Sequence, residues 1–204
     1  MKEDLGAESA PFSAGVRPPW CIGGLRLTRA VLDALERDAI TRYATPEEAC
    51  GYLVGPADDP LLCDELVALP NLANKLHALD PETYFRDGRT FFAFHEKRFD
   101  DAVRAGKALG RPVKVLYHSH LDAGAYFSVT DSAVLSQGEP PSVEGGPARL
   151  GVGPAWPLAF LVTSVRGLTG APVVDDHKVF VWEPRGRGPG AFVESAFEIV
   201  GAAP

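Results

Sequence analysis

The feature that most constrains this chain is a pair of histidines, His118 and His120, at the end of an apolar run. The run reads VKVLY over 113–117 and is rich in β-branched residues, which is typical of a buried strand. Successive side chains on a strand point to opposite faces, so both histidines face one side, about 6–7 Å apart along the strand. Ser119 faces the other side, where we expect it to pack or to support the site. The two imidazoles can therefore direct ring nitrogens onto one metal ion.

A carboxylate follows the histidine pair at a short distance. Asp131 is the last residue of the segment SVTD at 128–131. Two histidines and one carboxylate leave a zinc ion an open position for water, whereas structural zinc sites are usually closed by four protein ligands. The pattern therefore predicts a catalytic metal centre rather than a structural one.

The same residues also fit an ordinary helix start. Ser128 is a favoured N-cap residue, and Asp131 suits the first helical turn. A single histidine at the end of a strand is also more often a hydrogen-bonded polar residue than a ligand. The metal hypothesis depends on the whole combination H-x-H-x7-S-x2-D, which is far rarer by chance than its parts.

This combination resembles the signature of the JAMM/MPN+ (Mov34/MPN/PAD-1) zinc metalloproteases, in their prokaryotic type. The family also carries an upstream glutamate in an E-x-x-G element at the start of a strand, and this chain has EACG at 48–51. The phase of that element selects Glu48 rather than its neighbour Glu47. The competing interpretation is a capping box, in which Thr45 begins a helix with Pro46 at its first position.

The resemblance implies a division of roles among the site residues. One Zn²⁺ per chain would be held by His118, His120 and Asp131, and it would lower the pKa of water towards neutrality. Glu48 would act as general base and then as general acid, since amide hydrolysis must move a proton from water to the departing amine. Ser128 would donate a hydrogen bond to the oxyanion.

The hydrophobic pattern indicates an α/β or α+β domain, in which strands alternate with helices. The resemblance implies a cytidine-deaminase-like, three-layer MPN/JAMM domain with a mixed β-sheet flanked by helices. We expect strands at 25–27, 49–54, 64–70, 113–117, 158–165, 178–182 and 191–200. We expect helices at 28–43, from Asp80 onward, at 89–109, and after Ser128.

Composition sets the domain organisation and the compartment that we expect. Residues 1–20 are predicted to be a disordered tail, and 21–204 a single domain with a Gly/Pro-rich insertion at 137–157. A net charge of −7 argues against nucleic acid as the main partner, and no apolar run approaches a membrane span. Three widely spaced cysteines without a C-x-x-C pair, and no visible secretory signal, favour a cytoplasmic protein. The Ala, Gly, Pro and Arg bias favours a bacterial source.

The other histidines lack ligand spacing. His95 lies in HEKRF, where a zincin would need a second histidine at the position that Phe99 occupies. We therefore predict a surface or core-edge role for His95. His77 and His177 are expected in loops and are given no role.

The resemblance implies a metallopeptidase that cuts the peptide or isopeptide bond after the C-terminal Gly-Gly tail of a ubiquitin-like or sulfur-carrier protein. The segment 137–157 lies where the family has a variable substrate-contacting insertion. Leu121 departs from the pattern, because many prokaryotic relatives have proline after the second histidine.

Two other function classes compete with the peptidase. A non-catalytic MPN scaffold would bind partners without metal, although such members usually lose ligands. A non-haem iron(II) oxygenase also uses two histidines and a carboxylate, but it usually spaces them as H-x-D/E with a distant histidine on an all-β barrel.

Overall fold

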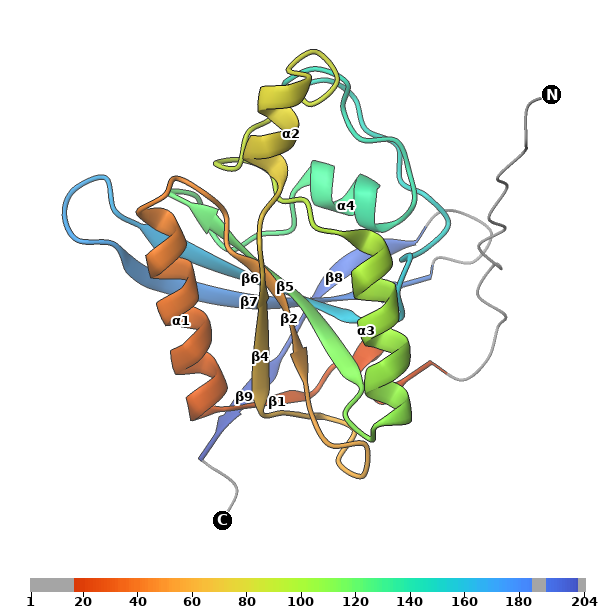
Figure 1. The fold of residues 1–204 in the computed structure, drawn as a ribbon. Coiled ribbons are helices and arrows are strands. Elements are labelled where there is room, and N and C mark those ends of the chain that lie inside the picture. The colour runs from red at the N-terminus through yellow and green to blue at the C-terminus, as the bar shows by residue number, and fades with distance from the viewer. Residues whose placement is uncertain (1–16, 185–189, 202–204) are drawn as a thin grey trace.

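A six-stranded mixed sheet runs through the centre of the computed structural model, which describes residues 17–184 and 190–201 (Figure 1). The strand order is β4-β2-β5-β6-β7-β8. These strands span Glu65–Leu69, Cys50–Val54, Val113–Leu121, Ala159–Arg166, Val173–Glu183 and Ala191–Ser195, in that order. Only the central β5–β6 pair is parallel, and the other pairs are antiparallel. The mixed sheet is the one expected from the sequence.

A smaller parallel sheet joins three distant segments of the chain. Its order is β3-β1-β9, with β3 at Leu62–Cys63, β1 at Leu25–Thr28 and β9 at Phe197–Val200. Just before β1, Pro19–Cys21 forms a short 3₁₀-helix, and the Trp20 indole donates a hydrogen bond to the Pro157 carbonyl at 2.9 Å. Of the tail predicted at 1–20, residues 1–16 lie outside the described residues.

Helices cover both faces of the large sheet and make three layers (Figure 1). Helix α1, Arg29–Tyr43, packs on one face with Val115 and Tyr117 of β5. Helices α3, Glu96–Ala108, and α4, Val129–Leu135, lie on the other face. There Phe99 of α3 and Leu135 of α4 share a core cluster with Leu116 of β5. The flanked sheet confirms the predicted fold class.

Helix α1 follows the sequence prediction closely. The Thr28 hydroxyl accepts a hydrogen bond from the Val31 amide at 3.2 Å, so Thr28 is the N-cap. Val31, Leu35 and Ala39 recur every four residues and are buried against the sheet. The apolar stripe formed by these residues therefore sets which face of α1 packs on the sheet.

The segment between β4 and α3 differs from the prediction. No helix starts at Asp80, because its carboxylate accepts the Thr83 amide and closes a turn. The helix expected at 89–109 begins only at Glu96, since Ala93 is tied to other chain segments through its amide and carbonyl. The short helix α2, Ala73–Leu79, was not expected from the pattern.

Three smaller predictions are settled by the same assignments. The capping box considered at Thr45 does not form, because only a turn precedes the extended segment that leads into β2. The prediction of loops at two histidines is wrong, since His77 lies in α2 and His177 lies in β7. His177 is held there by Thr163 and Glu36, which accounts for it without a metal.

Residues 17–184 and 190–201 contain no helix that combines the length and the apolar character that crossing a bilayer requires.

Strand β5 is buried at all nine positions, including a lysine within its apolar run. The Lys114 ammonium donates hydrogen bonds to the carbonyls of Pro56, Asp59 and Leu62 at 2.9, 2.7 and 2.7 Å. A buried charge is tolerated only where such partners replace water. Lys114 therefore fixes the loop that connects β2 to β3.

Replacing Lys114 with methionine should lower the free energy of unfolding. The methionine keeps the apolar stem but leaves the loop carbonyls without their donor, which costs about 1–3 kcal/mol. Urea unfolding would measure the change, with Lys107→Met on the exposed end of α3 as the control. Equal stability of Lys114→Met and the parent chain would contradict this account.

Candidate metal centre

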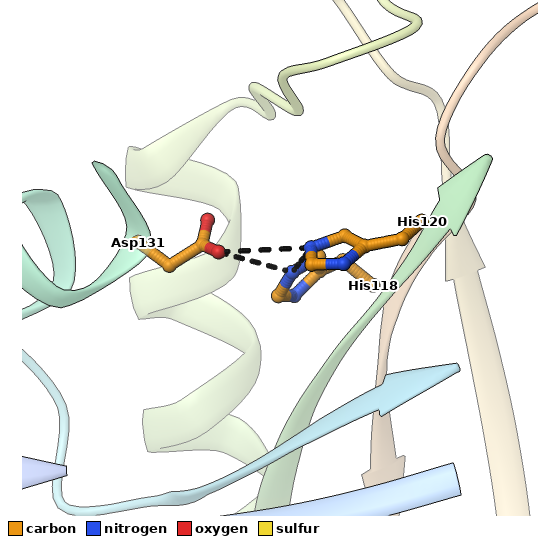
Figure 2. Close-up of side chains that lie close together, drawn as sticks. All are labelled: His118, His120 and Asp131. Carbon is orange, nitrogen blue, oxygen red and sulfur yellow. Dashed lines mark hydrogen bonds and ion pairs between the residues drawn. The ribbon is translucent and has the colours of Figure 1, made fainter. Parts of the chain in front are cut away.

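Three buried side chains converge at the end of β5 and the start of α4. His118 and His120 extend from β5, and Asp131 points toward both rings from α4 (Figure 2). The two Nε2 atoms lie 3.2 Å apart. Asp131 Oδ2 lies 3.5 Å from His118 Nε2 and 3.8 Å from His120 Nε2. The structure thus brings together the three residues that the sequence predicts as ligands.

These separations fit a tetrahedral metal ion. Zinc binds histidine nitrogen and carboxylate oxygen at about 2.0–2.2 Å, which places neighbouring ligand atoms roughly 3.3–3.5 Å apart on a tetrahedral face. The observed triangle has edges close to that range. The group can therefore hold a metal ion, and its two nitrogens and one oxygen are donors that suit zinc.

The orientation of His120 favours a metal-facing Nε2. Its Nδ1 lies 2.9 Å from the carbonyl oxygen of Gly124. A carbonyl only accepts hydrogen bonds, so Nδ1 carries the hydrogen, and in the neutral ring Nε2 presents its lone pair to the site. A backbone carbonyl behind a metal-binding histidine commonly fixes the ring in this way.

Aromatic side chains hold the two rings from outside. The Phe92 ring stacks on His118 with centroids 4.5 Å apart, and the Tyr126 ring packs edge-on against His120 at 4.8 Å. His118 is 1% exposed and His120 is 6% exposed. The nitrogens therefore meet in a site that is screened from bulk water on these sides.

The segment SVTD at 128–131 forms a capped helix start, and it also directs a carboxylate at the two histidines. Ser128 is the N-cap, and its hydroxyl accepts a hydrogen bond from the Asp131 amide at 3.0 Å. Asp131 Oδ2 in turn accepts hydrogen bonds from the Ser128 amide at 3.0 Å and from the Ser128 hydroxyl at 2.6 Å. One carboxylate oxygen thus closes a capping box and also faces both histidines.

The electrostatics favour the protonation states that bind a metal. Burial alone would raise the pKa of Asp131, but His118 and the polar contacts from both histidines and Ser128 lower it below its ordinary value. Burial lowers the pKa of His118, although Asp131 partly opposes this shift. An ionised carboxylate and a neutral imidazole are the forms that ligate metals.

Glu48 lies on the chain segment that leads into β2. Cys50 pairs with His118 in the antiparallel ladder, and continuing that register places Glu48 opposite His120 on the same face. The Ser119 amide donates to the Ala49 carbonyl at 2.9 Å, and the Ala49 amide donates to the Ser119 hydroxyl at 2.8 Å. Ser119 thus supports the site from the opposite strand face.

The Glu48 carboxyl group is poised to hold a proton. The side chain is 5% exposed. Burial, and then the negative charge of Asp131, raise its pKa well above the ordinary value, while Arg86 opposes the shift. A carboxyl group with a raised pKa holds a proton more strongly than an ordinary glutamate does.

Asn71 is a site residue that the sequence analysis missed. Its amide nitrogen donates to the carbonyls of Glu48 and Phe91, each at 3.0 Å. Its amide oxygen accepts from the amides of Ala73 and Ala93 at 2.9 and 3.1 Å. Asn71 therefore ties the Glu48 segment to the loop that carries Phe92. An asparagine after a strand is so common in loops that the sequence offers no specific signal for this role.

A family model of prokaryotic homologues of the JAB domain matches residues 28–165, a range that includes all five predicted site residues. No curated protein matches the chain significantly.

Solved structures with similar folds have low sequence identity to the chain. A protein from Desulfitobacterium hafniense is 22% identical, with 87% of this chain and 92% of that chain covered and a TM-score of 0.48. A JAB1/MPN domain protein from Archaeoglobus fulgidus is 17% identical, with 87% and 98% covered and a TM-score of 0.41. A protein from Salinibacter ruber is 21% identical, with 86% and 92% covered and a TM-score of 0.47.

Removing one of the three converging side chains should release bound metal. The purified chain is expected to hold close to one zinc ion, and His118→Ala should lose it because two remaining protein ligands hold zinc poorly. Elemental analysis after dialysis would measure the ratio, with the exposed His95→Ala as the matched histidine control. Full zinc content in His118→Ala would refute the ligand assignment.

Proposed function

The chain belongs to the prokaryotic homologues of the JAB domain, and from this and the convergence of His118, His120 and Asp131 we propose that it is a zinc-dependent metallopeptidase. Its substrate in this proposal is the peptide or isopeptide bond after the C-terminal Gly-Gly tail of a ubiquitin-like or sulfur-carrier protein. The buried His-His-Asp triangle is the observation that carries the proposal, because it leaves room for a fourth ligand from solvent or substrate.

Zinc bound in this triangle would supply a Lewis acid that lowers the pKa of water and polarises a carbonyl group. The histidines contribute neutral nitrogens, with His120 held by the Gly124 carbonyl. Asp131 contributes the negative charge, and its place in the capping box keeps it aimed at the rings. The protein's share of this work is therefore to fix three buried donor atoms around one position.

Glu48 is the proton carrier in this mechanism. Hydrolysis breaks the amide C–N bond, adds hydroxyl to the carbonyl carbon and places a proton on the departing nitrogen. A carboxylate beside His120 can take the proton from the attacking water and then deliver it to the amine. The raised pKa of Glu48 supports both steps, because the protonated form is then stable enough to act as the acid.

Ser128 is proposed to stabilise the oxyanion. Its hydroxyl donates to Asp131 Oδ2 at 2.6 Å in this structure. Serving an oxyanion requires the hydroxyl to rotate away from that acceptor. The Ser128 amide keeps its own hydrogen bond to Asp131 meanwhile, so the carboxylate retains a donor.

Two features favour an extended tail as the substrate. Strand β4 lies at the edge of the large sheet, where an extended peptide can be added through main-chain hydrogen bonds. The segment 137–157 contains one isolated bridge, between Glu139 and Arg149, and otherwise lacks regular structure. We propose that this segment contacts the carrier protein.

The competing functions have less support. The oxygenase hypothesis rests on an all-β barrel, and the mixed sheet with helices on both faces removes that basis. A non-catalytic scaffold would not need three buried donor atoms in one triangle. Burying such groups without a ligand is costly, so the intact set favours the enzyme.

Glu48→Gln should keep the fold and the zinc but lose activity on the order of 10²–10⁴ in kcat, the usual worth of a general base. The amide can still hydrogen-bond to water but cannot accept its proton. Glu47→Gln is the control, because Glu47 contacts Arg42 and Asn74 and a glutamine can still accept the Asn74 hydrogen bond. Turnover of a Gly-Gly fusion, together with bound zinc, would be measured for both. A fully active Glu48→Gln enzyme would overturn the mechanism.

Shortening the segment 137–157 should weaken binding of the carrier protein without changing zinc content. Deleting only 142–147 removes an exposed stretch and spares Trp156, whose indole donates to Asp100. We expect a raised KM for a full-length ubiquitin-like fusion and an unchanged KM for a short Gly-Gly peptide. Equal effects on the two substrates would show that the segment is a spacer.

A further inference from the structure

A small cavity opens beside the metal centre. It has a volume of about 90 Å³, and its lining includes Phe92, Phe94, Leu135 and Trp156, with Glu96 and Asp131 as its acidic residues. A cavity for one water needs only about 10–15 Å³. The space is therefore large enough for a side chain, and Asp131 connects it directly to the predicted ligand set.

The walls of the cavity are held in place. The Phe92 ring stacks on Phe94, with centroids 6.2 Å apart, and on His118 at 4.5 Å. The Trp156 indole donates to Asp100 at 2.6 Å and packs edge-on against Phe99 at 4.9 Å. Because these contacts already fix the rings, the side chains that line the cavity lose little conformational entropy when a ligand binds.

The chemistry of the lining favours a large apolar side chain as the occupant. Aromatic and aliphatic carbon forms most of the surface, which favours an apolar group. Glu96, which is exposed in the first turn of α3, is one of the two acidic residues among the lining. A large amino-acid side chain would bury its apolar surface against the rings.

We infer that this cavity accepts the apolar side chain of the residue on the amine side of the scissile bond. The inference rests on the proposed function, in which the carbonyl side of the bond is occupied by two glycines that have no side chain to fill a pocket. Asp131 forms part of both the cavity and the ligand triangle, so the cavity adjoins the proposed metal site. The favoured substrate is then a linear Gly-Gly-X sequence in which X is aromatic or a large aliphatic residue.

Cleavage of paired fusions tests the preference. A ubiquitin-like protein ending in Gly-Gly-Phe should be cut with a kcat/KM at least about 10-fold above one ending in Gly-Gly-Gly, since pocket-filling apolar groups are worth 10–200-fold. Val134→Phe narrows the cavity and should bring that ratio close to one. Leu109→Phe, on an exposed position beyond α3, should keep the ratio. Zinc content and unfolding midpoints confirm that both variants are folded.

A binding measurement tests the cavity without turnover. L-phenylalaninamide should shift the Trp156 indole N–H signal in a saturable NMR titration, at least about 10-fold more tightly than glycinamide, for metal-free and zinc-loaded protein alike. Val134→Phe should remove this difference. No saturable shift, or equal affinity for the two amides, would overturn the inference.

The two readouts separate the pocket from the reaction. Selective amide binding with no cleavage of any Gly-Gly fusion would sink the proposed function and leave the cavity assignment standing. Equal cleavage of both fusions without amide binding would support the proposed function and refute the cavity assignment. Faster cleavage of an isopeptide-linked lysine than of Gly-Gly-Phe would also count against an apolar side chain as the occupant.

Discussion

The pairing register between β2 and β5 is the constraint on which the site depends. It sets Cys50 opposite His118, and Ser119 locks it by exchanging hydrogen bonds with Ala49 through its amide and its hydroxyl. A slip of one residue would turn the glutamate to the α1 side of the sheet, because side chains alternate across a strand. A one-residue slip in either direction would therefore separate Glu48 from the histidine pair. If β5 were the strand that turned over, Lys114 and the apolar residues of β5, which are buried on both faces of the sheet, would exchange faces.

Asp131 joins local helix formation to the chemistry of the site. Its Oδ2 atom closes the capping box with Ser128 and also lies within 4 Å of both imidazoles. An isolated carboxylate is costly to bury, and the Ser128 amide and hydroxyl offset part of that cost before any metal binds. The helix start thus holds the anion that the histidines need as their partner. The two interpretations that the sequence left open, a helix cap and a metal ligand, are therefore compatible, because the same carboxylate closes the cap and faces both histidines.

Local patterns predict those parts of the chain whose conformation depends on local interactions. Strand β5 and the capped helix α1 follow from apolar periodicity, and the spacing of His118, His120 and Asp131 identifies residues that meet in space. The late start of α3 could not be predicted, because Phe92 continues the helical period while hydrogen bonds from Asn71 hold its neighbours extended. Those bonds join positions about twenty residues apart. The cavity could not be predicted from the sequence either, because its walls come from three separate segments: the loop before α3, helix α4 and the segment containing Trp156.

Asn71 connects Glu48, the proposed proton carrier, to the proposed substrate pocket. One of its hydrogen bonds fixes the backbone of Glu48, and two others fix the residues on either side of Phe92. Phe92 contacts His118 with one face and contributes to the cavity wall. A shift of this loop would therefore move the base, a metal-site ring and the pocket together. The Asn71 side chain holds all three in place. A cavity occupant that displaced Phe92 would therefore also disturb Glu48 and His118. An occupant that fits against Phe92 would leave the proposed metal site undisturbed. Under the proposed function, this coupling would give the protein a physical basis for rejecting a substrate residue that fits the cavity poorly.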